Sequence, residues 1–373
     1  MQNYKIKKLI TCNIPISACN LKCHYCYISQ LSDWERNKVS LSLNPELIEK
    51  ALSNKRLGGS CIINLTGKGE TLIPKEMPEV IRRLLQQGHF LEVVTNGTLT
   101  NRFDEIIQFP RELLSRLEFK FSFHYLELIE RNWLDRFFSN VKKIREAGCS
   151  FTVELMPNDE IIPYIDDIKK VCIDNLGALC HLTIGRDDTD RRKILTNLPV
   201  EEYLRIWEQF DSEMFRFKYS VFNKKRCEFC YAGMWSLHIN LATGDSQPCY
   251  GCSYDQNIYK NIDKPLYFRP VGKKCKQPFC FNAHAFLTLG DIPELITPTY
   301  AEIRDREDVD GNHWLTEEIQ NAFSSKLYDN NSTMKGKDRL LYFLSSPLHI
   351  SRILNYNKKT IWKNILAKSI FHE

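Results

Sequence analysis

The sequence predicts an α/β fold in which a partial (β/α)6, TIM-like barrel precedes a small cysteine-rich domain and a helical carboxyl-terminal tail. Three observations lead to this prediction. Six strand patterns are interspersed with five helical patterns up to residue 210, which is typical of a parallel sheet. Cysteines become frequent from Cys227 to Cys280, where this alternation stops. The end of the chain carries apolar residues at helical spacing between lysines. The predicted domains are therefore 1–215, 216–290 and 291–373.

The six strands are expected in short apolar runs, at 9–16, 60–66, 90–95, 117–124, 151–156 and 179–185. Helices are expected between or after them, at 44–57, 77–87, 133–147, 161–175 and 199–210. Asn44 and Pro45 suit the start of the first helix, because asparagine caps free amides and proline favours the first turn. Gly88 and Gly148 suit the ends of two others. Right-handed crossovers would curl such a sheet into an open barrel, with its site at the carboxyl ends of the strands.

The composition indicates a globular protein with a large core. Hydrophobic residues make up 43% of the 373 residues, yet no apolar run is as long as a membrane span. There is no convincing signal peptide, and 14 cysteines spread over this length, mostly at metal-ligand spacings, are typical of a reducing compartment. We therefore expect a cytoplasmic protein. The net charge of +5 comes from the end of the chain, residues 326–373, and the rest is close to neutral.

Three cysteines near the amino terminus, Cys19, Cys23 and Cys26, have a C-x3-C-x2-C spacing. Three thiolates on one loop can hold three irons of a 4Fe-4S cluster and leave the fourth iron open to an outside ligand. Half of a zinc site is the alternative, although zinc sites usually complete four ligands in pairs. The pattern therefore favours a cluster with one reactive iron.

This spacing, with an aromatic residue before the last cysteine, resembles the radical S-adenosylmethionine (radical SAM) superfamily. The resemblance implies that Cys19, Cys23 and Cys26 bind a 4Fe-4S cluster, that its open iron chelates S-adenosylmethionine (SAM), and that Tyr25 packs beside the adenine. It also implies an enzyme that reductively cleaves SAM to a 5'-deoxyadenosyl radical, which abstracts hydrogen from the substrate.

The same resemblance implies further cofactor contacts at the ends of later strands. The loop after the second strand stands where the family has a Gly-Gly-Glu motif, so Gly69 and Glu70 are expected to contact the methionine amino group. Lys68 departs from the usual glycine, and an ordinary turn is the alternative. Ser122, at the end of the fourth strand, is a candidate ribose contact. Glu154, on the fifth strand, would contact the ribose or methionine region or form a salt bridge.

A second group of cysteines follows the barrel, in the predicted domain 216–290. Its first four have the spacing C-x2-C-x18-C-x2-C, which fits a zinc ribbon. The pattern C-x13-G-x4-C, with a hairpin turn expected at Thr243-Gly244, instead resembles the auxiliary-cluster extension called SPASM or its shorter version, Twitch. Cys227 and Cys252 stay unassigned and leave room for a second cluster. The resemblance implies one auxiliary 4Fe-4S cluster with four ligands: Cys230, Cys249, Cys275 and Cys280.

An auxiliary cluster with four cysteines would accept an electron from an oxidised substrate. The resemblance therefore favours an oxidoreductase that dehydrogenates or couples its substrate, with an electron donor such as flavodoxin or ferredoxin. The chain begins close to the first strand and leaves no room for an amino-terminal peptide-recognition domain. We therefore expect a carbohydrate-like small molecule as the substrate rather than a peptide. Peptide or protein modification by the same chemistry is the first alternative, and a zinc-ribbon binding module on an inactive barrel is the second.

The predicted tail at 291–373 begins irregularly and ends in a basic amphipathic helix. Such a helix would either touch an anionic membrane surface or dock on the barrel with its lysines in water, and docking is the more ordinary arrangement. No RNA-binding motif is present, so we expect no nucleic-acid partner.

Overall fold

The structure, a computed structural model, describes residues 4–32, 42–190, 192–250, 252–254, 256–273, 275, 277, 279–280, 283–337 and 339. The chain divides into two units, Met1–Asn330 and Asn331–Glu373. The features below belong to the first, apart from Gly336, a control position in the second. The amphipathic helix expected at 350–371 lies outside the described residues.

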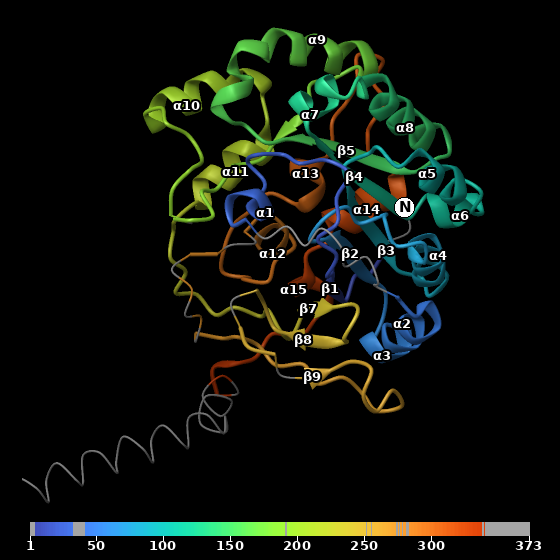
Figure 1. The fold of residues 1–373 in the computed structure, drawn as a ribbon. Coiled ribbons are helices and arrows are strands. Elements are labelled where there is room, and N and C mark those ends of the chain that lie inside the picture. Colours follow the sequence, from blue (N-terminus) through green and yellow to red (C-terminus); the bar gives the residue numbers. More distant parts are fainter. Residues whose placement is uncertain are drawn as a thin grey trace, which may run out of the picture. The chain divides into compact units, whose positions relative to one another are not determined.

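The described residues of the first unit form one sheet with the strand order β6-β5-β4-β3-β2-β1-β7-β8-β9 (Figure 1). Strands β1 to β6 are parallel, β7 also pairs in parallel with β1, and β8 and β9 continue the sheet in antiparallel fashion. The six parallel strands expected for the barrel are therefore confirmed, although β6 has two residues only. The strands are β1 Lys8–Ile14, β2 Cys61–Gly67, β3 Phe90–Thr95, β4 Leu117–Phe123, β5 Ser150–Leu155, β6 His181–Leu182, β7 Ser236–Asn240, β8 Asp245–Gln247 and β9 Gln256–Asn257.

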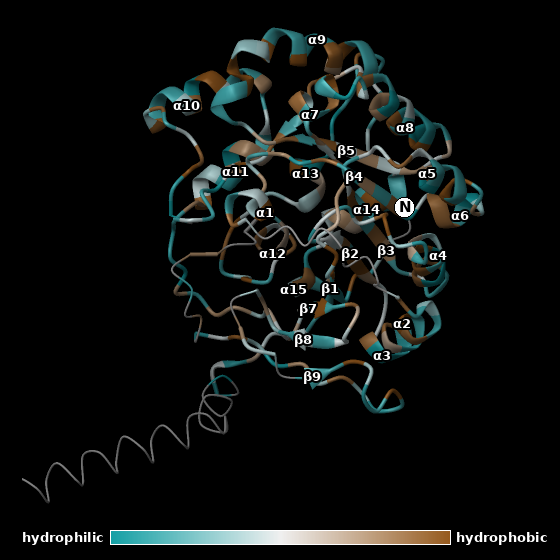
Figure 2. Cartoon of the chain, viewed as in Figure 1, coloured by the Kyte–Doolittle hydropathy of each residue, from teal (hydrophilic) through white to brown (hydrophobic). Residues whose placement is uncertain are grey.

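Helices connect the barrel strands and cover the outer face of the sheet (Figure 1). In Figure 2, hydrophobic and hydrophilic residues alternate along α8, α9 and α10, as expected for helices with one face on a core. The helix expected at 44–57 is two helices, because Ser53 has an extended backbone. The helices up to the end of the barrel are α1 Tyr27–Gln30, α2 Pro45–Ala51, α3 Asn54–Leu57, α4 Met77–Gln86, α5 Thr100–Ile106, α6 Arg111–Leu114, α7 Tyr125–Glu130, α8 Leu134–Glu146, α9 Ile165–Leu176, α10 Val200–Trp207 and α11 Glu213–Val221.

The segment expected to be irregular after residue 290 contains short helices, of which α13 begins with a capping box at Thr299. The helices that follow the barrel are α12 Ala283–Thr288, just before this segment, and α13 Tyr300–Arg304, α14 Glu317–Ser324 and α15 Leu327–Asn330 within it. After α13 the chain reaches the start of β5, where the amide of Phe151 donates to the carbonyl of Trp314 at 3.1 Å and the two rings stack. Residues 283–330 are therefore packed against the barrel rather than loosely attached.

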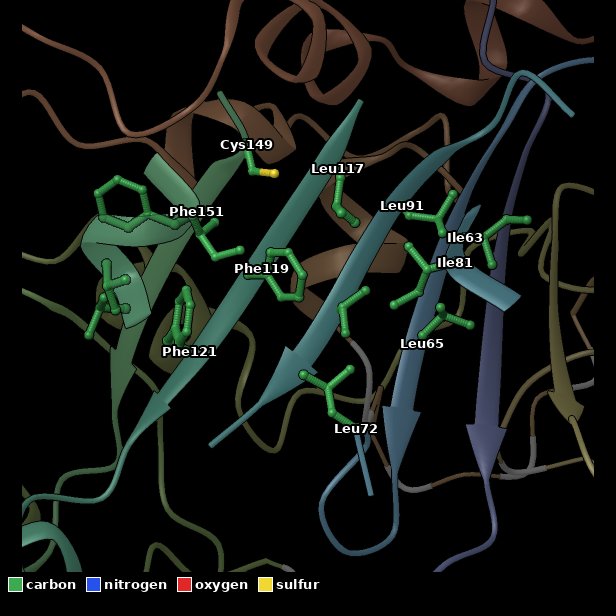
Figure 3. Packing of buried hydrophobic residues seen from close by; sticks show 14 of the residues in the cluster. Ile63, Leu65, Leu72, Ile81, Leu91, Leu117, Phe119, Phe121, Cys149 and Phe151 are labelled. Atoms are coloured by element: carbon green, nitrogen blue, oxygen red, sulfur yellow. The ribbon is translucent and has the colours of Figure 1, made fainter. Parts of the chain in front are cut away.

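Side chains alternate between the two faces of the parallel strands. The outward set is apolar and packs under the helices, as Figure 3 shows for Ile63, Leu65 and Leu91 beside Ile81 of α4. The inward set is largely polar, and it includes the following residues of β1 to β5: Thr11, Asn64, Thr66, Glu92, Glu118, Lys120, Thr152 and Glu154. Parallel strands covered on both faces usually carry apolar residues on both. The polar inner face therefore marks the barrel interior as a place for charges and ligands.

Among the described residues, no helix combines the length and the hydrophobicity that a membrane crossing requires.

Candidate active site

The three amino-terminal cysteines lie on one tight loop between β1 and α1. Cys23 is buried, and Cys19 and Cys26 are half-buried. The carbonyl of Cys23 accepts hydrogen bonds from the amide of Cys26 at 3.2 Å and from the hydroxyl of Ser29 at 2.7 Å. The loop is thus fixed before the first turn of α1 begins at Tyr27.

Burial raises the pKa of Cys19 to about 11 and also raises the pKa values of Cys23 and Cys26. These thiols are therefore protonated at neutral pH in the metal-free chain. Iron binds the thiolate form, so loading this loop with metal must release protons.

One cavity, called here the cysteine cavity, is lined by all three cysteines together with the ends of β2, β3 and β4. Its lining includes Gly69, Glu70 and Ser122, which the sequence singled out. The remaining walls come from apolar and polar residues of the same loops: Leu21, Ile28, Gly67, Lys68, Thr71, Val94, Thr95, Asn96 and His124. This is the carboxyl-terminal edge of the parallel strands, where such barrels place their sites.

Glu70 is buried at this edge, and its carboxylate joins two loops. Oε1 accepts hydrogen bonds from the amide of Leu72 at 3.0 Å and from the hydroxyl of Thr95 at 2.8 Å, and Oε2 accepts from the amide of Asn96 at 2.7 Å. Burial raises the pKa of Glu70, and these donors oppose that rise. The carboxylate therefore ties the loop after β2 to the end of β3.

Asn96 lies in the turn Thr95-Asn96-Gly97 at the end of the third strand, where the resemblance to the radical SAM superfamily implies a turn near the cofactor, and it lines the cysteine cavity. Its side-chain amide donates to Asn20 Oδ1 at 2.7 Å and lies 3.7 Å from Cys19 Sγ. The amide of Leu21 lies 3.5 Å from the same sulfur. Asn96 therefore connects Glu70 to the cysteine loop. Its position at the end of a strand, before Gly97, was the available signal.

Gly69 is required by close contact rather than by backbone angle. A Cβ atom there would collide with the carbonyl oxygen of Ala18. The Gly69 amide donates to the Ile16 carbonyl, and the next amide, of Glu70, donates to Ala18 at 3.0 Å. The loop after β2 thus lies directly on the chain that leads to the cysteines.

We therefore expect Gly69→Ala to lower the free energy of unfolding by about 1–3 kcal/mol, because an added methyl group in a packed site forces the backbone apart. Thermal unfolding of the metal-free protein measures this effect. Gly336→Ala is the matched control, since no atom lies within 4 Å of its Cβ position. Equal unfolding temperatures for the two variants would contradict the close packing described here.

Two other candidate residues, Tyr25 and Glu154, do not line the cysteine cavity. The Tyr25 hydroxyl is 2.6 Å from Nδ1 of His124, and the ring is buried against the cysteine loop outside the cavity lining. Glu154 lies in the barrel interior, where Oε1 is 2.7 Å from Lys120 Nζ and 2.6 Å from Arg304 Nη1. The structure therefore surrounds Glu154 with ion-pair partners rather than with the cysteines.

Arg304 is the centre of this buried ion network. Its guanidinium also lies 2.7 Å from Glu118 and 3.6 Å from Glu92. Burial alone would raise the pKa of Glu154, but the charges of Lys120, Lys218 and Arg304 hold that pKa well below its usual value. The carboxylates of β3, β4 and β5 are thus balanced by cations that come mostly from outside these strands.

A second cavity, called here the barrel chamber, lies among the inward side chains of β1 to β4 and has a volume of about 180 Å³. Helices α12 and α13 contribute His284, Ala285 and Tyr300, and Tyr250 comes from the cysteine-rich segment. Val94 lines both this chamber and the cysteine cavity. The strand side chains that line the chamber are Leu9, Thr11, Ile62, Asn64, Thr66, Glu92, Val94 and Lys120.

The later cysteines are only partly gathered. Burial raises the pKa of Cys230 well above its usual value, and the neighbouring Asp291, Cys249 and Cys280 raise it further, so these three thiols share one region. Cys275, the fourth expected ligand, is exposed, as is Cys227. In the described part of the chain, no three His, Cys, Asp or Glu residues are arranged to hold a single metal ion.

The hairpin expected around Thr243-Gly244 is confirmed, since β7 and β8 pair in antiparallel fashion on either side of it. Gly244 has a φ of +78°, and a Cβ atom there would meet the ring of Tyr259. Cys249 follows the second strand of this hairpin, and the Cys252 amide donates to its carbonyl at 2.9 Å.

The residues present fit a cluster with three protein ligands. All three cysteines of the C-x3-C-x2-C loop line one cavity, and the apolar residues Leu21 and Ile28 line it with them. An amide approaches the Cys19 sulfur, as is usual where a protein tunes iron–sulfur chemistry. Only glycine fits at position 69 of the cavity lining, because any side chain there would collide with the Ala18 carbonyl oxygen.

Comparison with known proteins identifies the first part of the chain. Residues 13–166 match the radical SAM superfamily. The probable GTP 3',8-cyclase of Pyrococcus abyssi (strain GE5 / Orsay) is 38% identical over 80 residues, which are 21% of this chain and 24% of the cyclase. The match thus spans about a quarter of that relative.

Solved structures with a similar arrangement include Streptococcus suis SuiB bound to S-adenosylmethionine, at 16% identity and a TM-score of 0.49. That likeness covers 69% of this chain and 65% of SuiB. Native anSMEcpe with bound AdoMet is 14% identical with a TM-score of 0.44, and the likeness covers 68% of this chain and 79% of that one. With the cysteine loop, the cavity and the sequence match taken together, residues 13–166 of this chain are a radical SAM domain.

Proposed function

We propose that this chain is an oxidoreductase that binds a 4Fe-4S cluster through Cys19, Cys23 and Cys26 and binds SAM in the cysteine cavity. The observation that carries the proposal is that these three thiols line the same cavity as Gly69 and Glu70. When bound, the cluster and SAM supply a 5'-deoxyadenosyl radical, which removes hydrogen from a substrate carbon.

The chain's own residues bind and orient. The loop after β2 lies directly against the backbone of Ala18, on the chain that leads to the cysteines, because Gly69 has no side chain. Glu70 keeps that loop in place through its hydrogen bonds to Leu72 and Asn96. Ser122 is our candidate for the ribose contact, since it lines the cavity from β4. Tyr25 remains our candidate for the adenine side and would reach it from the cysteine loop.

We also propose that Cys230, Cys249, Cys275 and Cys280 bind an auxiliary 4Fe-4S cluster of the Twitch or SPASM kind. The nearness of Cys230 to Cys249 and Cys280 supports this. Tyr250, the residue after Cys249, lines the barrel chamber. A metal group bound at Cys249 would therefore adjoin the chamber and could take the electron that an oxidised substrate gives up. A flavodoxin or ferredoxin is the electron donor that this chemistry requires.

The substrate that we propose is a carbohydrate-like small molecule. The barrel chamber adjoins the cysteine cavity at Val94 and is lined mostly by polar side chains of moderate size. Its volume of about 180 Å³ suits a small molecule better than a length of peptide. A hydrogen atom to be removed would then lie between the two cavities.

Metal analysis after anaerobic purification tests the proposal. We expect about eight irons and as many acid-labile sulfides per chain, with broad absorbance, because two 4Fe-4S clusters would be present. Cys230→Ser should remove about half of the iron, and Cys61→Ser is the matched control, since Cys61 lies in β2 outside the cysteine cavity. Bound zinc without sulfide would instead support a zinc-ribbon module and would overturn the proposed function.

A further inference from the structure

The barrel chamber has the capacity of one six-membered ring with its substituents. A cavity of about 150 Å³ in a protein core can hold benzene, and this chamber measures about 180 Å³. It takes residues from three parts of the chain, for example Glu92 from the sheet, Tyr250 from the cysteine-rich segment and His284 from α12. Its size therefore limits the ligand to a single small ring.

The charged groups of the chamber already have partners. Lys120 Nζ lies 2.7 Å from Glu154 Oε1. Glu92 accepts hydrogen bonds from the hydroxyl of Tyr300 and the amide of Asn64, and it lies 3.6 Å from Arg304. A charged ligand would have to break one of these buried pairs, which leaves an uncompensated buried charge. The chamber therefore favours a ligand without net charge.

Neutral polar groups of the chamber, in contrast, can still form hydrogen bonds to a ligand. Within the described part of the chain, the hydroxyls of Thr11, Thr66 and Tyr250 and the ring of His284 make no hydrogen bond to another residue. The Tyr250 ring is held in place by His238, at 4.2 Å between ring centroids. Burial and the cations Lys218 and Lys120 lower the pKa of His284 well below its usual value, so its ring is neutral.

We propose that the barrel chamber binds a neutral, hydroxyl-rich ring of monosaccharide or cyclitol size. Its hydroxyls would pair with Thr11, Thr66, Tyr250 and His284, while the ion pairs around Glu92 and Lys120 stay intact. Thr66 and Val94 lie on the side where the chamber adjoins the cysteine cavity. That this ligand is the enzyme's substrate rests on the proposed function. Its binding to the chamber does not, because binding requires no turnover.

Saturation-transfer NMR on the anaerobically reconstituted full chain tests this binding, with myo-inositol and D-glucose as probes. Glucose 6-phosphate and glucosamine serve as charged comparators of similar size. We expect a neutral probe to bind and both charged comparators to bind less. Tyr250→Phe should raise the dissociation constant of the neutral probe about threefold to tenfold, because one hydrogen bond between uncharged groups is lost.

Tyr254→Phe is the matched control, since Tyr254 is 58% exposed and does not line the chamber. Ala285→Leu is a second variant, which should abolish binding by filling the chamber from α12. The chamber proposal is overturned by stronger binding of a charged comparator, by no binding of either neutral probe, or by neutral binding that both variants leave unchanged.

The proposed function fails in a different way. It is judged by 5'-deoxyadenosine formed from SAM by the reduced protein without any probe. A protein that cleaves SAM but binds no neutral ring contradicts only the chamber assignment. One that binds the ring but never cleaves SAM contradicts only the proposed function.

Discussion

Cys23→Ala is expected to abolish 5'-deoxyadenosine formation and to remove about four of the irons bound per chain. Cys23 is the most buried of the three cysteines on the loop after β1, with 5% of its surface exposed. Two remaining thiols cannot replace its position, because the loop is fixed by hydrogen bonds to its backbone. Anaerobic reconstitution, iron analysis and chromatography of the SAM products measure both effects.

Cys61→Ala is the control for this variant. It also removes a buried thiol, but one on β2 that packs in the core under the helices. We expect it to keep its iron and its product formation, with a modest loss of stability from the small cavity left behind. Deoxyadenosine formation by Cys23→Ala at the level of this control would contradict the ligand assignment.

Arg304→Met is expected to lower the free energy of unfolding by about 3–5 kcal/mol, because it removes one partner of buried ion pairs. The guanidinium of Arg304 is fully buried, and it lies within 2.7 Å of both Glu118 and Glu154. Methionine fills much of the same space without the charge. The decrease in the free energy of unfolding would therefore measure the cost of leaving the buried carboxylates without a counter-charge. Urea unfolding of the metal-free chain measures it.

Lys142→Met is the matched control for this charge removal. Lys142 lies on the exposed side of α8, 3.8 Å from Glu146, and both side chains are mostly in water. Such a pair contributes about 0–1 kcal/mol. Similar losses in the two variants would mean that the carboxylates of the barrel interior are hydrated or protonated, and that Arg304 does not hold them together.

The sequence predicted the parts of the fold that depend on local pattern. The strands from β1 to β5 were found because their outward residues are mostly apolar, as in Ile63 and Leu65. Helices α6 and α7, of four and six residues, are too short to show helical periodicity and were missed. The place of β7 beside β1 depends on a pairing over more than two hundred residues, which no local pattern reveals.

The candidate site divides in the same way. The cysteine loop and the loop with Gly69 and Glu70 are continuous in sequence, so their spacing could be interpreted directly. Glu154 was left between a cofactor contact and a salt bridge, because its partner Arg304 is 150 residues away.

The barrel chamber was not predicted, since Tyr250 and His284 come from segments outside the barrel. Alternating polar residues such as Asn64 and Thr66 in a parallel strand were the available signal. They indicate an interior that is not filled by apolar packing.

The cations of the barrel interior have a consequence for how this protein could have evolved. Arg304 belongs to α13, far beyond residues 13–166, yet it neutralises side chains from three strands of the radical SAM domain. The segment that carries the recognisable motif is therefore not an autonomous module that could be exchanged between proteins. Any recombination that replaced the later segment would have to supply a new counter-charge, so the two halves of the chain are bound to change together.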